Sequence, residues 1–124
     1  MCNGARLRIW AALFASVLLT GCYVFSNPPG KGRYAEQRYA QSAPVIAALQ
    51  RYHAKHGPYP ASLTSLVPDE IAQLPDLYTG DEAVDRGTYQ RIGTSYELGF
   101  RYVEGGMNQC RYRPKAGWVC DSHI

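Results

Sequence analysis

Histidines, carboxylates and cysteines are the side chains of this 124-residue chain whose spacing could support chemistry. His53 and His56 are three positions apart, so both rings could reach one metal ion from a helix. No Glu-x-x-His motif accompanies them, and histidines on a helix face are the simpler interpretation. Asp121, Ser122 and His123 are triad residue types, but triads are assembled from separate elements and not from neighbours in a tail. No catalytic residue is predicted, and the chain is interpreted as non-enzymatic.

A cluster of carboxylates is the second candidate site. Asp76, Asp81, Glu82 and Asp85 place four acidic side chains within ten residues. Calcium takes six to eight oxygen ligands, so such a cluster could bind it. The spacing does not match an EF-hand, and a solvated acidic loop over residues 76–93 is the other interpretation. A periplasm-facing module that binds calcium or a small ligand is therefore the alternative hypothesis, and no other cofactor is expected.

Cys110 and Cys120 are expected to form a structural disulfide. If the chain around them folds as a hairpin with its turn at residues 114–116, the two cysteines face each other. Tyr112 then faces Trp118 on the same side, which makes the pairing self-consistent. An exported protein meets oxidising conditions, and closing so short a loop adds about 2–3 kcal/mol. The absence of a C-x-x-C motif argues against a redox-active pair.

The N-terminal residues 1–21 have the layout of an export signal. Two arginines precede an apolar run over residues 9–19, which is about half the roughly 20 residues that a membrane-spanning helix needs. The run ends in Leu19-Thr-Gly-Cys22, which resembles the lipobox of bacterial lipoproteins. That resemblance implies cleavage before Cys22 and lipidation of this cysteine, with acyl chains such as palmitate.

A lipid on Cys22 would place the protein at the cell envelope. Anchoring free energy grows by about 0.8 kcal/mol per buried CH₂. Tyr23 and Val24 follow the cysteine, and in lipoprotein families the lack of an aspartate there goes with the outer membrane, facing the periplasm. Residues 22–33 are rich in Pro and Gly and are expected to be a flexible tether. The net charge of +3 is too small to indicate a nucleic-acid partner.

An amphipathic helix is the element that must organise the domain. Its N-cap is Ser42 or, alternatively, the helix begins near Arg33 and kinks at Pro44. Gly57 suits the residue after a helix, and Pro58 prevents its continuation. The apolar stripe has helical spacing and consists of Val45, Ile46, Leu49, Tyr52 and His53.

The second half of the chain has the period of a sheet. A short helix with Leu63 and Leu66 follows the first helix, and the pattern then changes to strict alternation over residues 95–103. Further strands are expected at 108–113 and 117–121, with a possible edge strand at 88–92. The predicted fold is α+β: one domain over residues 34–124, in which the helix packs on an antiparallel sheet of three to four strands.

Ten tyrosines are the compositional peculiarity of this chain. Tyrosine is enriched at protein interfaces because its ring is apolar and its hydroxyl is polar. Four tyrosines are expected to be more exposed than those of the core and could form an interaction surface, and these are Tyr34, Tyr59, Tyr78 and Tyr89.

The order of these elements resembles the globular part of type IV pilin-like proteins, nearest to the major pseudopilin of type II secretion systems. The matching residues are Ile46-Ala-Ala-Leu49, Tyr52, the Gly57-x-Tyr59-Pro60 corner and the pair Leu63 and Leu66. The resemblance implies a helix packed across an antiparallel sheet, and some members bind calcium in the loop that the acidic cluster occupies.

One departure from that family bears on function. Pilins retain their apolar segment after cleavage and use it as the filament core, whereas here the apolar run precedes Gly21 and would be removed. The sequence therefore predicts a pilin-type head mounted on a lipid. Such a protein would act through contacts with an envelope protein, with a secretion or pilus-like apparatus as the candidate partner.

Overall fold

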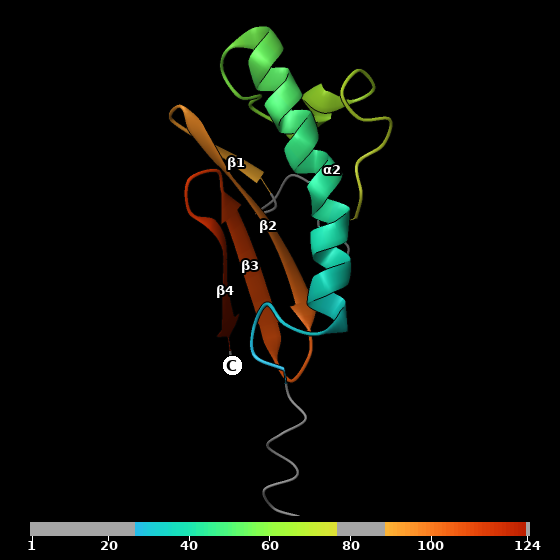
Figure 1. Cartoon of the computed structure of the whole chain (residues 1–124), viewed down its shortest axis with the longest axis vertical. Helices are drawn as coiled ribbons and strands as arrows, with labels where there is room; N and C mark the ends of the chain where they lie inside the picture. Colours follow the sequence, from blue (N-terminus) through green and yellow to red (C-terminus); the bar gives the residue numbers. More distant parts are fainter. Residues whose placement is uncertain (1–26, 77–88, 124) are drawn as a thin grey trace, which may run out of the picture.

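The computed structural model describes residues 27–76 and 89–123. Helix α2 spans Arg33–His56, and a short 3₁₀ helix, η1, spans Leu63–Leu66. Four strands form one antiparallel sheet in the order β1-β2-β3-β4, and α2 lies across one of its faces (Figure 1). The strands are β1 (Tyr89–Ile92), β2 (Ser95–Val103), β3 (Met107–Arg113) and β4 (Gly117–His123). The predicted mixture of one helix and an antiparallel sheet is confirmed, with four strands.

Helix α2 begins at the earlier of its two predicted start sites. Ser42 lies inside the helix and is buried, and its hydroxyl donates to the Arg38 carbonyl at 2.8 Å instead of capping the N-terminus. Pro44 is accommodated within the helix although it lacks an N–H donor. The predicted end is confirmed, because Gly57 has φ +88° and donates its N–H to the His53 carbonyl at 2.9 Å. Within the described residues, no helix is long and apolar enough to cross a membrane.

The core lies between α2 and the face of β2 that alternation predicted. Tyr96, Leu98, Phe100 and Tyr102 are each at most 2% exposed. They pack in one cluster with apolar residues of α2 and with both leucines of η1. Burial of each such side chain contributes about 1.5–3 kcal/mol, so this interface is the main source of stability.

Residues 27–32 belong to the domain and not to a tether. The Gly30 N–H donates to the Tyr102 hydroxyl at 2.7 Å, and the Tyr39 hydroxyl donates to the Gly30 carbonyl at 3.1 Å. The Asn27 amide donates to the Glu104 carboxylate at 3.0 Å. The flexible segment predicted over residues 22–33 is thus too long at its C-terminal end, because partners distant in sequence hold this part of the backbone. Residues 22–26 lie outside the described residues.

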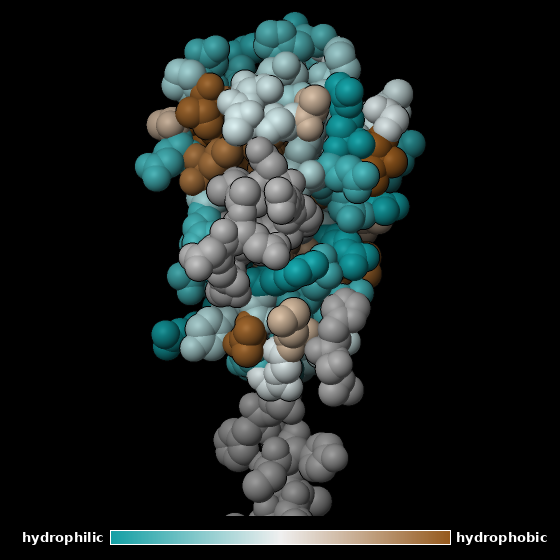
Figure 2. Space-filling model, turned by 180° about the vertical axis from the view of Figure 1, so that it is seen from behind, coloured by the Kyte–Doolittle hydropathy of each residue, from teal (hydrophilic) through white to brown (hydrophobic). Residues whose placement is uncertain are grey.

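The two ends of the domain carry different parts of the chain. The segment from residue 27 and the β2–β3 turn lie at one end, together with the end of β4 (Figure 1). The C-terminal end of α2 and the β1–β2 turn lie at the other end, toward which the β3–β4 turn also points. Seen from behind, the surface is mostly polar, with apolar side chains gathered toward the upper end and a small group at the lower end (Figure 2).

Candidate functional site

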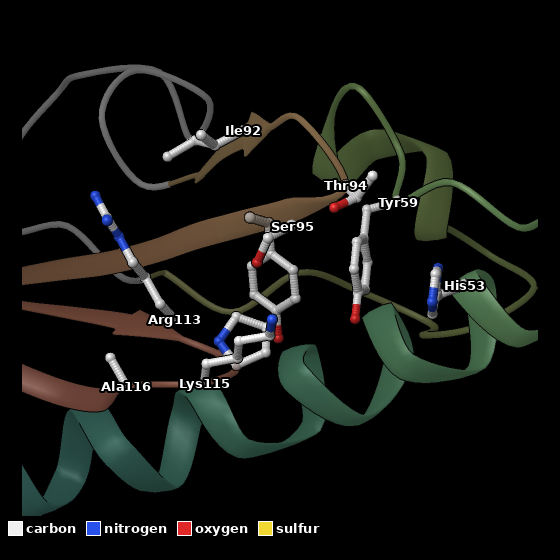
Figure 3. Close-up of a pocket in the computed structure, with 10 residues that line it drawn as sticks. His53, Tyr59, Ile92, Thr94, Ser95, Arg113, Lys115 and Ala116 are labelled. Carbon is white, nitrogen blue, oxygen red and sulfur yellow. The ribbon is translucent and has the colours of Figure 1, made fainter.

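A cleft with a volume of about 470 Å³ opens at the end of the domain opposite residue 27. Three turns that are far apart in sequence meet there: the corner after α2, the β1–β2 turn and the β3–β4 turn (Figure 3). Small-molecule and cofactor sites commonly have 300–1,000 Å³, so the cleft has the size of a binding site. Its walls are formed by His53, Tyr59, Ile92, Thr94, Ser95, Tyr96, Arg113, Pro114, Lys115 and Ala116.

Aromatic rings form one side of the cleft. The Tyr59 ring stacks on His53 with 4.2 Å between centroids and an interplanar angle of 11°, and it meets Tyr96 edge to face at 4.7 Å. In the close-up, Tyr59 stands between His53 and the Ser95 side of the cleft (Figure 3). Tyr96 is 1% exposed and belongs to the core, whereas Tyr59 is half-buried.

The backbone on either side of Tyr59 is held by the edge of the sheet. Arg91 donates to the Tyr59 carbonyl at 3.3 Å, and the Tyr89 hydroxyl donates to the Pro60 carbonyl at 2.6 Å. Gly57 reverses the chain after α2, and strand β1 then fixes the corner that follows. The Tyr59 side of the cleft is therefore positioned by hydrogen bonds from the β1 edge strand.

Cationic side chains line the opposite side of the cleft, and no carboxylate is among the lining residues. Arg113 lines the cleft and also forms an ion pair with Glu97. Its Nη2 lies 2.7 Å and its Nε 2.8 Å from one Glu97 oxygen. Arg111 lies 3.9 Å from the other Glu97 oxygen. Lys115 has no hydrogen bond or ion pair with any other residue that the structure describes. Lys115 is thus a cation at the cleft whose charge is available to a ligand.

The buried phenols near the cleft are neutral. The pKa of Tyr89 is raised to about 12, mainly by burial, with a lowering by Arg91 and smaller raising effects of Tyr59 and Tyr52. Burial also raises the pKa of Tyr96 well above its ordinary value, with added effects from Tyr112, Tyr59 and Tyr89. The aromatic side of the cleft therefore offers rings and uncharged hydroxyls and carries no negative charge at neutral pH.

The cleft continues a series of ring contacts that runs through the core. Neighbouring rings lie 5.0, 5.4, 6.2, 4.7 and 4.2 Å apart between centroids, within or close to the range favoured by aromatic pairs. The series consists, in order, of Tyr39, Trp118, Tyr112, Tyr96, Tyr59 and His53.

The predicted disulfide is confirmed and lies away from the cleft. Cys110 and Cys120 are direct partners across β3 and β4 and are bonded, and Tyr112 faces Trp118 as expected. Cys110 is fully buried, and the Tyr39 hydroxyl lies 3.2 Å from the Cys120 sulfur. The bond therefore links the edge strand β4 covalently to β3, next to the segment at residue 30.

The four tyrosines predicted as an interaction surface do not share one surface among the described residues. Tyr34 is 49% exposed at the start of α2, whereas Tyr59 lines the cleft beyond its other end. The expectation that Tyr89 is exposed is wrong: it is 7% exposed because its hydroxyl bonds to the corner and its ring packs 5.8 Å from Tyr96. Tyr78 lies outside the described residues.

The candidate metal ligands are only partly described. Asp76 lies in the described part of the chain, whereas Asp81, Glu82 and Asp85 lie outside it, as does the proposed lipid site Cys22. Within residues 27–76 and 89–123, no three metal-type side chains lie together. The rings of His53 and His56 contact different partners, Tyr59 and Tyr52, at 4.2 and 4.3 Å.

Most of the cleft was missed by sequence reasoning. Of its lining residues, only Tyr59 was singled out for interaction, because turn residues such as Thr94 and Lys115 have no signature of their own. The available signal was topological: alternate turns of an antiparallel sheet lie at the same end. A basic residue in the turn after Cys110 therefore had to lie near the turn that precedes residue 95.

Comparisons with known proteins give no match among family models, curated proteins or solved structures.

Proposed function

We propose that this chain is a lipid-anchored protein of the bacterial cell envelope that acts by binding another envelope protein through the cleft. The proposal combines the signal-like layout of residues 1–22 with the position of the cleft. The chain enters the domain at residue 27, and the turns whose residues line the cleft lie toward the other end (Figure 1). A domain held by its N-terminus would thus present the cleft away from the membrane.

The length of α2 sets the scale of that separation. Its 24 residues rise about 1.5 Å each, so the two ends of the helix are about 36 Å apart. A pilin-like head agrees with a helix packed across an antiparallel sheet, and a secretion or pilus-like apparatus in the outer membrane is the proposed setting. The opposite placement of chain entrance and cleft is the observation that carries this proposal.

The anchor is tested by fractionating envelopes from cells that produce Cys22→Ala or the matched variant Cys2→Ala. Cys22→Ala is expected to lose membrane attachment, whereas Cys2→Ala is expected to keep it, because Cys2 lies in the removed segment. The intact mass of the membrane form should match residues 22–124 plus acyl groups, with a gain of two hydrogens on reduction. A membrane form that keeps residues 1–21 without lipid would contradict the proposal.

The contact is tested by site-specific photo-cross-linking in intact envelopes. A cross-linking residue in place of Lys115 is expected to capture a discrete protein, whereas the same residue in place of Gln50, on the exposed face of α2, is not. Equal cross-linking at both positions would show that the cleft is not the site of contact.

A further inference from the structure

The cleft is the open end of the series of ring contacts, and this bears on what it binds. Each inner ring of the series touches rings on both sides, from Trp118 to Tyr96. At the cleft, His53 is exposed and Tyr59 is only half-buried, so both residues are partly accessible to a ligand. A ring that enters the cleft can make the same stacked or edge-to-face contacts as those inside the core.

The rest of the lining favours a ligand that is apolar in the middle and polar at its edge. Ile92 is 43% exposed at the cleft, and Pro114 and Ala116 add apolar surface from the β3–β4 turn. Thr94 and Ser95 contribute hydroxyls from the β1–β2 turn. This combination of apolar walls and a few polar groups is usual for sites that orient a bound group.

The charges near the cleft favour a negative group on the ligand. Lys115 has no partner among the described residues, and the only carboxylate paired with Arg113 is Glu97, outside the lining. The charged residues that line the cleft are Arg113 and Lys115, and no carboxylate is among the lining residues. Complementary potentials of this kind steer encounter and fix orientation.

We propose that the cleft binds a peptide segment of a partner protein in which an aromatic side chain lies next to a carboxylate. The aromatic ring packs against the end of the series formed by Tyr59 and His53, and the carboxylate pairs with Lys115. A volume of about 470 Å³ admits one ring-bearing residue and its neighbours but not a folded surface, so the segment projects from its protein. The inference rests on the proposed function only in taking the occupant to be a protein.

Binding is tested by fluorescence anisotropy of labelled tetrapeptides with the full protein isolated in mild detergent. One peptide carries Phe-Asp internally and has an amidated end, and a second ends in Phe with a free carboxylate. A third carries Phe-Asn and is amidated. The first or the second is expected to bind at least threefold more tightly than the third, and which one binds identifies the source of the carboxylate. No binding by either acidic peptide, or equal binding by all three, overturns the proposal.

Two pairs of variants measure separately the contributions of the Tyr59 ring and of the Lys115 charge to peptide binding. Lys115→Gln is expected to weaken the acidic peptide about threefold to fivefold and to leave the Phe-Asn peptide unchanged, as for an exposed ion pair. Lys31→Gln removes the same charge at the other end and should change neither. Tyr59→Leu is expected to weaken both peptides about tenfold, whereas Tyr34→Leu should not.

Equal effects of Lys115→Gln and Lys31→Gln would overturn the proposal, and so would unchanged binding by Tyr59→Leu. Lys115 lies in an exposed turn, so its substitution tests the proposal even if Tyr59→Leu fails to fold. The two proposals can fail independently. If the peptides do not bind, the Cys2→Ala variant should still be attached to the membrane, and if the protein carries no lipid, the peptides should still bind.

Discussion

Gly30 is the residue at which the incoming chain, the disulfide and helix α2 meet. Its φ is +81°, and a Cβ placed on it would lie 2.6 Å from the Cys120 sulfur and 2.9 Å from the Tyr39 hydroxyl oxygen. Its N–H and carbonyl both bond to tyrosine hydroxyls. A residue from the Pro- and Gly-rich segment is thus a packed part of the domain.

Gly30→Ala is expected to destabilise the protein more than Gly93→Ala. Both residues have a positive φ, which costs an alanine about 1–2 kcal/mol, but Gly93 has open space where its Cβ would lie. Only Gly30→Ala adds a clash with the disulfide, so we expect it to lose at least about 1 kcal/mol more. Urea unfolding of the two variants measures the difference, and equal losses would show that residue 30 is not packed as described.

Tyr89 gives the folded protein a specific sensitivity to alkaline pH. Its pKa is raised to about 12 by burial, so the folded state favours the neutral phenol. The stability contributed by this group is complete below the ordinary pKa of 10 and is lost as the pH rises toward 12.

We therefore expect the free energy of unfolding to fall between pH 10 and 12, and to fall less steeply in Tyr89→Phe than in the matched Tyr34→Phe variant. Denaturant unfolding at a series of pH values measures the slope. Tyr89→Phe should also cost about 1 kcal/mol at neutral pH, because the Pro60 carbonyl loses its donor. Identical slopes in both variants would contradict a buried, neutral phenol.

At the scale of elements, one buried carboxylate joins α2 to the segment after η1. Glu70 is 7% exposed, and its oxygens lie 3.2 Å from Arg51 Nε and 2.6 Å from Lys55 Nζ. The hydrogen bond from Lys55 is the main reason that the pKa of Glu70 is lowered, with further contributions from the charges of Lys55 and Arg51 against an opposing effect of burial.

Glu70→Gln is expected to lower the melting temperature at neutral pH. The melting temperature of this variant should also fall less than that of the wild type as the pH is lowered. A lowered carboxyl pKa stabilises the fold above the ordinary value of 4.5, and this stability is lost as the pH falls through the lowered pKa. Melting curves between pH 2 and 7 measure the effect, with Asp69→Asn, its exposed neighbour, as the control. Parallel curves for Glu70→Gln and the wild type would rule out this ion pair as a source of acid sensitivity.

The disulfide joins two elements that the sheet already pairs, β3 and β4. Reduction is expected to lower the free energy of unfolding by about 2–3 kcal/mol, because a closed loop restricts the unfolded chain. The shift of the urea midpoint with reductant measures this. A Cys110→Ala and Cys120→Ala double variant should show no such shift, and a shift in that variant would point to another effect of the reductant.

The sequence predicted contacts that follow from local period or symmetry and missed those between distant segments. Alternation placed the buried side chains of β2 correctly, and the mirror relation of Cys110 and Cys120 about the turn gave their register. The start of α2 stayed open because Ser42 and Pro44 are equally compatible with a first turn and with an interior. The docking of Gly30 and the ion pairs of Glu70 depend on partners at least nine residues away, which carry no local pattern.

For the whole molecule, the arrangement of the two ends predicts which residues meet the bilayer. With a lipid on Cys22, four residues separate the anchored cysteine from Asn27, and the five steps between their Cα atoms span at most about 17 Å. A photo-cross-linking residue at Met107, which is 51% exposed and begins β3 beside the β2–β3 turn, is expected to label lipid. The same residue at Ala54, near the far end of α2, is expected not to. Lipid labelling at both positions would mean that the domain lies flat on the membrane.

The docking of residues 27–32 also determines where a partner can be found. A long flexible linker would let the cleft sample a large volume above the membrane and would lower the effective concentration of the cleft in that volume. With a lipid on Cys22, the four residues 23–26 would limit the cleft to a narrow range of heights above the lipid. Within that range the effective concentration of the cleft is high, and it falls to nearly zero where the linker cannot span the distance. The cleft would thus bind a given peptide only where that peptide lies at a height above the bilayer that the cleft can reach.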